Sequence, residues 1–361
     1  MRSRRFLRGG RMGLALAMAL FFRPAGANGG AEVAGISGPT FDLTARDGHI
    51  LGGDGSTIYV WGYANGSGAM QYPGPTLIVG EGEAITVNLT NELSAATSIV
   101  FPGQVGVTTT GGTPGLLTAE AAPGATVSYR FTAHRPGTYH YHSGTRPDLQ
   151  VEMGLVGAII VRPAGFDPTA PAAYGHPDSA YTHEYLFLFT EMDIQIHRLM
   201  EFGMESLVDT TTYHPVFWFI NGRNLPDVLL PTFVPWMKNQ PYNCLPRMHP
   251  GERLLKRVIG GGRDIHPHHP HGNSIKILAR DGRMLESAPG AGTDLAPVIF
   301  TLNSVPGQTV DAIFEWTGKG MGWDIYGHTA DDPLEPFEYA PDHGRPFPVA
   351  DRADARSVRL L

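Results

Sequence analysis

The sequence predicts an all-β protein built from two sandwich or barrel domains. Its 361 residues include 46 glycines and 30 prolines, a content that favours many turns and short strands over long helices. Short segments of alternating apolar and polar residues are separated by turn residues, as in a β-sandwich or barrel. The single cysteine, Cys244, excludes an internal disulfide, so a hydrophobic core has to hold the fold together.

The strands of the first domain are read from three segments. Residues 75–93 contain a strand, a glycine-marked turn and a second strand whose apolar positions alternate, namely Ile85, Val87 and Leu89. Residues 126–133 alternate in the same way, and residues 154–163 form a more continuous apolar run. We therefore place the first domain at residues 38–163.

A change of composition marks the boundary between the domains. Residues 164–182 are rich in proline, alanine and small polar residues and have no apolar period, which is typical of a linker. A second β series follows in residues 183–331, with strands expected at 184–193, 217–224 and 252–260 and a helix within 193–208. Residues 332–361 are proline-rich and charged and are expected to form an extended tail.

The first 27 residues have the pattern of a signal peptide. A basic start is followed by the apolar run 13–22 and by the small residues Ala25-Gly26-Ala27. Residues 3–7 also resemble a twin-arginine signal from which one residue is missing, and an ordinary Sec signal is the alternative. The pattern predicts a periplasmic or secreted protein, and the mature chain has no further apolar run long enough to span a membrane.

Removal of this segment would leave an acidic protein. The segment contains six arginines and no acidic residue, so the remainder has 21 basic and 34 acidic residues and a formal net charge of −13. This balance argues against nucleic acids and anionic membrane surfaces as partners.

Histidines stand at informative spacings in three places. His140 and His142 are two residues apart in a predicted strand, so both imidazoles project from the same face. The segment 264–273, "DIHPHHPHGN", places four histidines in six positions, and His269 and His271 repeat the two-residue spacing. His328 ends the segment "GMGWDIYGH". Imidazoles in such pairs suit copper, zinc, iron or nickel.

These segments resemble the multicopper oxidase family, over nearly the whole mature chain. The resemblance is carried by "PGPTLIVGEGEAITVNLTNEL", "PGTYHYHSG" with the following "GLVGAIIV", "FWFINGRNLPD", "MHPGERLLKRVI" and "HPHHPHGN". It implies two cupredoxin-like Greek-key β-sandwich or barrel domains. It also implies a copper cofactor, O2 or a small molecule as the reactant, and a homotrimer in which the metal site lies between subunits.

Residue by residue, the resemblance implies a partial set of copper ligands. His142, His271 and His328 match ligands of the coupled dicopper (type 3) pair, and His269 matches the mononuclear type 2 ligand. His266 matches a type 1 ligand, and His140 could add a further ligand from the same strand face as His142.

Other family ligands are missing. Val100, Pro102, Gly144 and Tyr326 replace histidines, and Gly327 replaces the type 1 cysteine. Since a blue-copper centre needs a cysteine thiolate, no type 1 copper is expected, and one or two copper ions remain. Cys244 is interpreted as a small buried residue.

The sequence leaves three functions open. The first is a copper-dependent oxidoreductase with a centre made of histidines alone, and the second is a non-catalytic periplasmic protein for copper binding or tolerance. The third is a cupredoxin scaffold whose metal site has decayed. His268 is expected to face solvent, and Trp218 is interpreted as a packing residue of the core or an interface.

Overall fold

The computed structural model describes residues 32–248, 252–271, 273–315 and 358–359. The predicted signal peptide, His328, Tyr326 and Gly327 lie outside these residues. We call residues 32–163 the N-terminal half and residues 183–315 the C-terminal half. No helix among the described residues is long and apolar enough to cross a membrane.

The N-terminal half consists of two sheets packed face to face. One has the order β4-β3-β2-β6-β10-β7 and the other β1-β5-β12-β11. Their strands are β1 (Ile36–Ser37), β2 (Thr40–Leu51), β3 (Thr57–Asn65), β4 (Met70–Gln71), β5 (Leu77–Gly80), β6 (Ala84–Asn91), β7 (Thr108–Gly111), β10 (Thr126–Thr132), β11 (Gly137–His142) and β12 (Val156–Arg162). A short ribbon of β8 (Thr113–Pro114) and β9 (Ala119–Glu120) and the helix α1 (Pro147–Gln150) complete it.

The C-terminal half contains one large sheet with the order β14-β13-β16-β22-β18-β19, and β20 pairs with β18. Its strands are β13 (His183–Met192), β14 (Phe217–Ile220), β16 (Arg253–Gly260), β18 (Ile275–Arg280), β19 (Arg283–Met284), β20 (Val298–Ile299) and β22 (Thr309–Glu315). Two-stranded ribbons join β17 (His266–His268) to β21 (Leu302–Ser304) and β15 (Arg247–Met248) to β23 (Val358–Arg359).

The helical segments of this half and of the connection before it are short. They are η1 (Pro177–Ser179), α2 (Ile194–Glu201), η2 (Glu205–Leu207), η3 (Asp227–Leu229) and η4 (Pro235–Met237). The expected helix within 193–208 is α2, and it begins after Asp193, whose carboxylate accepts a hydrogen bond from the Gln195 N–H at 2.9 Å.

The expected alternation appears where one face of a strand meets solvent. In β6, Ile85, Val87 and Leu89 are buried in the core between the two N-terminal sheets, while the residues between them are partly exposed. The sheets also contain parallel pairs, such as β2 with β6 and β13 with β16, so they are mixed rather than purely antiparallel.

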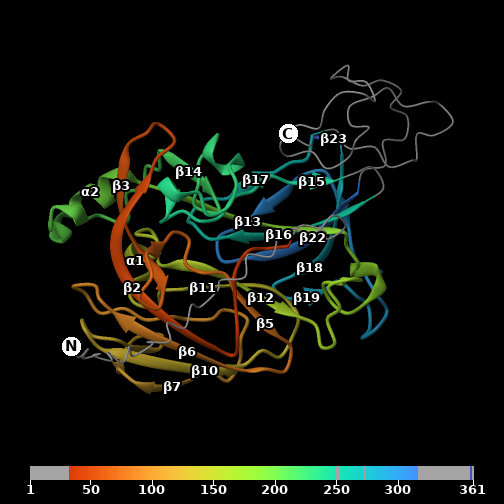
Figure 1. The fold of residues 1–361 in the computed structure, drawn as a ribbon, viewed down its shortest axis with the longest axis horizontal. Coiled ribbons are helices and arrows are strands. Elements are labelled where there is room, and N and C mark those ends of the chain that lie inside the picture. The colour runs from red at the N-terminus through yellow and green to blue at the C-terminus, as the bar shows by residue number, and fades with distance from the viewer. Residues whose placement is uncertain (1–31, 249–251, 272, 316–357, 360–361) are drawn as a thin grey trace, which may run out of the picture.

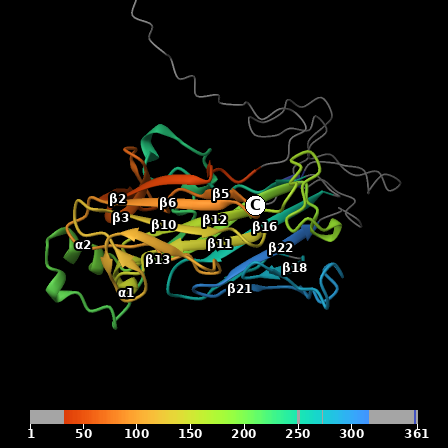
Figure 2. The same cartoon turned by 90° about the horizontal axis from the view of Figure 1, so that it is seen from below.

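The continuous apolar run of β12 has a different cause. Ile159 and Val161 enter the core of the N-terminal half, whereas Ala158 and Ile160 pack against Leu188 and its neighbours in the C-terminal half. Figure 1 shows the resulting order of layers, with β5, β12 and β11 between the β6–β10 sheet and the sheet of β16 and β22, and Figure 2 shows these layers from below. Because both faces of β12 are covered, both are apolar.

A buried ionic network crosses the same interface. Glu184 of β13 accepts hydrogen bonds from Arg257 Nε at 2.7 Å and from Arg162 Nη1 at 2.8 Å, and its side chain is fully buried. Arg257 Nη1 also donates to Thr138 Oγ1 at 3.0 Å, and that hydroxyl donates to Asp311 Oδ1 at 2.5 Å. Burial by itself would raise the pKa of Glu184, but the two arginines lower it from its ordinary 4.5 to about 2.

We predict that Glu184→Gln destabilises the protein by roughly 3 to 5 kcal/mol at neutral pH, because Arg257 then keeps a buried charge without its main partner. Since the folded-state pKa of Glu184 is depressed, its stabilising contribution is present above about pH 4.5 and is lost as the pH falls towards 2. The difference between the variant and the wild type should therefore shrink over that range. Urea unfolding at several pH values measures it, with Glu92→Gln, a half-exposed carboxylate, as the control; a constant difference would contradict the prediction.

Candidate metal centre

The first candidate ligands lie at the end of β11. His140 and His142 project from one face of the strand, as predicted, and their rings stack with centroids 5.2 Å apart and planes inclined by 12°. His140 is 4% exposed and His142 is half-buried. Burial, followed by the proximity of His142, lowers the pKa of His140 to about 3, and burial also lowers the pKa of His142. Both imidazoles are therefore neutral at neutral pH, the state in which they bind metals.

The backbone fixes the tautomer of His142. Its Nδ1 lies 2.9 Å from the carbonyl oxygen of Ser143, and because a carbonyl can only accept, Nδ1 carries the hydrogen. Nε2 then keeps a free lone pair. A histidine that binds a metal is commonly held in this way, with its other ring nitrogen donating to a carbonyl.

Val100 occupies the space beside this pair. Its N–H donates to the His142 carbonyl at 2.8 Å, and the His142 N–H donates back at 3.2 Å. A Cβ atom on Gly144 would lie 2.7 Å from Val100 Cγ1. Two of the four positions at which the family resemblance expects further histidines, 100 and 144, are thus adjacent, and a larger side chain at 144 would require Val100 to move.

The histidine-rich segment 264–273 divides into two parts. The strand β17 ends at His268, so our expectation that His269 and His271 form a pair on a strand is wrong. Past the strand their rings still approach each other, with centroids 5.2 Å apart and planes at 46°. Proline at 270 explains the end of the strand, because it has no N–H to donate to a neighbouring strand.

His269 has the same tautomer as His142. Its Nδ1 lies 2.9 Å from the Phe300 carbonyl oxygen, and its ring packs on the Phe300 ring at 4.3 Å between centroids. Nδ1 therefore carries the hydrogen and Nε2 is free to bind a metal. His271 is exposed.

His268 does not face solvent, so that prediction is also wrong. Its Nε2 lies 3.0 Å from Lys256 Nζ, and its ring centroid is 4.9 Å from that of Phe187. Burial, and then the nearby Lys256, lower the pKa of His268 to about 3. His268 is thus neutral and serves as the hydrogen-bond acceptor of a lysine that is itself largely buried.

His266 is held by a buried carboxylate. Its Nε2 lies 2.7 Å from Glu191 Oε2, and its ring stacks on Phe189 with centroids 5.7 Å apart. The Glu191 side chain is fully buried, and its other oxygen accepts the N–H of Asp264 at 2.8 Å and the N–H of Arg263. These bonds fix the position of the segment that leads into β17.

No motif or spacing in the sequence predicted the group of side chains that joins Glu191 to the N-terminal half. The Tyr213 hydroxyl donates to Glu152 Oε2 at 2.9 Å and lies 3.4 Å from Glu191 Oε1. Burial, and then these two carboxylates, raise the pKa of Tyr213, so the hydroxyl keeps its proton. His197 Nε2 lies 3.5 Å from Glu152 Oε1 at the other end. Glu152 lies 39 or more positions before the other three residues, and the four follow no regular spacing.

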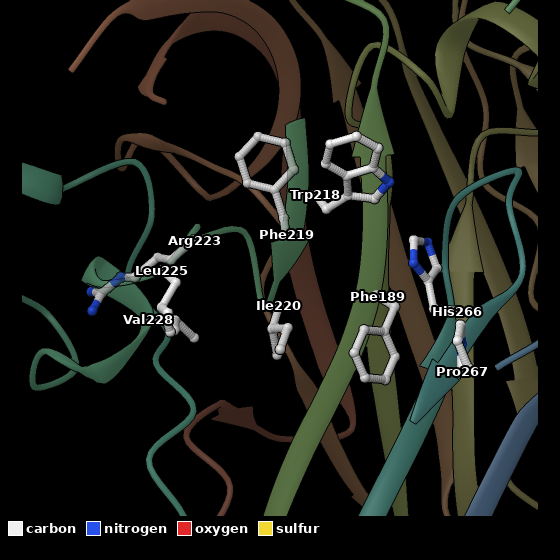
Figure 3. A pocket seen from close by; sticks show the side chains of 9 residues that line it. All are labelled: Phe189, Trp218, Phe219, Ile220, Arg223, Leu225, Val228, His266 and Pro267. Atoms are coloured by element: carbon white, nitrogen blue, oxygen red, sulfur yellow. The ribbon is translucent and has the colours of Figure 1, made fainter. Parts of the chain in front are cut away.

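A hollow of about 280 Å³ adjoins His266 (Figure 3). Trp218 lines it and is 55% exposed, so of the two predicted roles the core is wrong, and packing at an interface stays a prediction. The residues that line the hollow are Phe189, Trp218, Phe219, Ile220, Arg223, Leu225, Val228, His266 and Pro267.

The remaining candidates are placed as follows. Cys244 is buried, as expected, and burial raises the pKa of its thiol to about 12. Within residues 32–248, 252–271 and 273–315, no three or more His, Cys, Asp or Glu side chains are grouped so that they could hold a metal. The pairs His140–His142 and His269–His271 thus remain separate in one chain.

Comparison with known proteins agrees with this architecture. The multicopper oxidase domain model matches residues 53–165. Multicopper oxidase MCE of Talaromyces pinophilus is 39% identical over 95 residues, which are 26% of this chain and 15% of that protein. Copper resistance protein A of Pseudomonas syringae pv. tomato is 37% identical over 89 residues, 25% of this chain and 14% of that protein. The matched part of this chain thus spans less than a sixth of either relative.

The structure resembles a blue copper oxidase from Nitrosomonas europaea, with a TM-score of 0.57 and 24% identity over 76% of this chain and 74% of that chain. Both halves therefore have the cupredoxin sandwich fold that the sequence predicted. Residues 53–165 thus belong to the multicopper oxidase family, and the chain as a whole has the cupredoxin fold.

We predict that Glu191→Gln destabilises the protein by roughly 1 to 3 kcal/mol, because the amide offers one acceptor oxygen where the carboxylate offers two to buried donors. Urea unfolding followed by tryptophan fluorescence measures the loss. Glu201→Gln is the control, since Glu201 also bonds a histidine, His49 at 2.9 Å, but lies at the surface. Equal losses of stability in the two variants would contradict the prediction that Glu191 stabilises the fold through its buried hydrogen bonds.

Proposed function

We propose that this chain is an exported copper-binding protein that acts as an oxidoreductase through a centre made of histidines alone. The observation that carries the proposal is that His142 and His269 have the same tautomer. Each is held through an Nδ1–H bond to a backbone carbonyl, which leaves Nε2 directed for coordination. A neutral imidazole set of this kind fits copper.

The proposed ligands are His140, His142, His269, His271 and, by family resemblance, His328. Copper bound there would supply one-electron exchange with a small molecule or O2. The protein's own part is to keep His140 and His142 neutral by burial and to orient His142 and His269 through backbone carbonyls. His266 stays outside the proposed centre because the cysteine that would accompany it in a type 1 site is missing from the matching position.

Cys244 does not supply a blue-copper ligand in this proposal. A thiol whose pKa is raised to about 12 by burial stays protonated at neutral pH, whereas copper needs the thiolate. A centre without that thiolate lacks the intense blue colour of the type 1 site.

Either pair alone supplies only two ligands, which are too few for a closed site. We therefore propose that the centre is completed between subunits. In a homotrimer, His140 and His142 of one subunit would meet His269 and His271 of the next. Exposed apolar side chains flank the second pair and would be covered by such contact: Ile265, Val298, Phe300 and Val305.

A non-catalytic role in copper binding or tolerance is the second candidate. The incomplete ligand set within one chain favours this role, because a site that closes only on assembly can hold copper without turnover. The similarity to copper resistance protein A is consistent with it.

The first test measures copper by mass spectrometry and electron paramagnetic resonance after purification with copper. We expect bound copper without an intense blue absorption band, and loss of that copper when His269 and His271 are both replaced by alanine. His134→Ala, at an exposed histidine outside the proposed set, should retain it. A chain that stays free of copper would indicate a decayed site, and an intense blue band would mean that Cys244 is a ligand.

The second test measures the assembly by sedimentation. We expect a trimer, and Phe300→Asp should dissociate it and lower the copper content, since it places a charge on the surface that packs against His269. Leu207→Asp, at another exposed apolar residue, should do neither. A monomer with its full content of copper would contradict the shared site. Turnover with O2 in the copper-loaded trimer separates the oxidoreductase from the binding protein.

A further inference from the structure

The histidine-rich segment contains the tripeptide His-Pro-His twice in succession. The first copy is residues 266–268 and forms β17, and the second copy is residues 269–271. A shift of the chain by three residues would put one copy in the place of the other with the same side chains at every position. The tripeptide itself therefore does not determine which copy lies on the fold and which is left to bind a metal.

The ribbon of β17 and β21 is attached to the large sheet of the C-terminal half by side chains. Its two strands pair with each other, and neither pairs with a described strand of that sheet. His266 and His268 are two positions apart on β17 and so project from the same side of the strand. His266 meets Glu191 of β13 there, and His268 meets Lys256 of β16.

Lys256 is an unusual residue for its position. It is 7% exposed, and its Nζ lies 5.2 Å and 5.3 Å from the ring centroids of Phe187 and Phe314, two core residues. Burial lowers the pKa of Lys256 to about 8, so the ammonium keeps its charge at neutral pH. Within the part of the chain that the structure describes, no carboxylate pairs with it. Because a buried unpaired charge is costly, stability alone does not explain a lysine among these rings.

The bond of Lys256 is selective for an unprotonated ring nitrogen. An ammonium group can only donate, so His268 Nε2, at 3.0 Å, accepts and its lone pair is used in this bond. Glu191 offers an acceptor to His266 at 2.7 Å. The sheet thus presents one donor and one acceptor on neighbouring strands, placed to receive two histidines that are two residues apart. The Asp264 N–H, which bonds the same carboxylate at 2.8 Å, brings the first copy to this place.

We propose that Lys256 divides the repeat between structure and metal binding. By holding His268 on the sheet, it keeps the first copy away from copper and leaves the second copy at the proposed centre. His269, the next residue, keeps its Nε2 free because its Nδ1 donates to the Phe300 carbonyl. The inference rests on the copper-binding function proposed above, and it makes Lys256 a positioning residue that acts through His268.

Lys256→Met tests this role, because methionine fits among the aromatic rings but has no donor for His268. We expect a folded variant whose copper affinity, measured by competition with a chelator, is roughly tenfold lower. The electron paramagnetic resonance spectrum of its bound copper should broaden, since the free His268 allows a second set of imidazoles to bind.

Lys276→Met is the matched control, since Lys276 is half-buried and donates to Thr293 Oγ1 at 2.7 Å. It should leave both the copper affinity and the spectrum unchanged. A wild-type affinity in Lys256→Met, or an equal loss in Lys276→Met, would overturn the inference.

A double variant, Lys256→Met with His268→Phe, shows whether the lysine acts through the histidine. It removes both hydrogen-bonding partners and keeps an apolar contact between the ribbon and the sheet, a replacement that is often close to neutral for stability. We expect its copper affinity to return towards that of the wild type. An affinity as low as that of Lys256→Met alone would contradict the proposal, because the loss would then come from the charge of the lysine.

Hydrogen exchange of the metal-free chain separates this inference from the proposed function. The amides within residues 264–271 should exchange faster in Lys256→Met than in the wild type, since the segment has lost one of its attachments. Equal exchange rates in the two proteins would refute the inference. Faster exchange in the variant, together with a wild-type chain that binds no copper, would refute the copper-binding function and still support the attachment of the segment by Lys256.

Discussion

The packing of β12 against β13 and β16 is the constraint on which the molecule depends. Ile159 and Ala158 point to opposite sides of one strand, and each side is the wall of a different core. The two halves are therefore not independent domains joined by a linker. Separating them would expose the apolar face of β12 that contains Ala158. Buried polar contacts cross the same interface, where Arg162 of the N-terminal half pairs with Glu184 and Arg257 donates to Thr138.

This interface also decides where the metal ligands lie. His140 and His142 occupy the end of β11, a strand that borders β16 and β22, so their separation from the second histidine pair is set by rigid sheets. The copper centre proposed above would therefore take its remaining ligands from another subunit.

Alternation and turn residues predicted the strands around Ile85 and Val87. A sheet with one face in solvent imposes a period of two on the apolar residues of its strands. The same pattern also placed His140 and His142 on one face. The pattern did not predict that His268 packs against buried residues or that Trp218 is exposed. The residues next to them in sequence do not determine these environments. Those environments come from Lys256 and from the open edge at β14, contacts between residues distant in sequence. The links among Glu152, Glu191 and Tyr213 could not be predicted for the same reason.

The dense histidine run is best understood as four side chains with different acceptors and donors. His266 bonds a buried carboxylate, His268 accepts from a buried lysine, His269 donates to the Phe300 carbonyl, and His271 is exposed. At His269 the bond to the carbonyl fixes the ring and leaves Nε2 free, and at His266 the bond of Nε2 to Glu191 fixes the ring in a similar way. Neighbouring histidines in one short segment thus serve separate chemistry, because hydrogen bonds to the second ring nitrogen decide what the first can do.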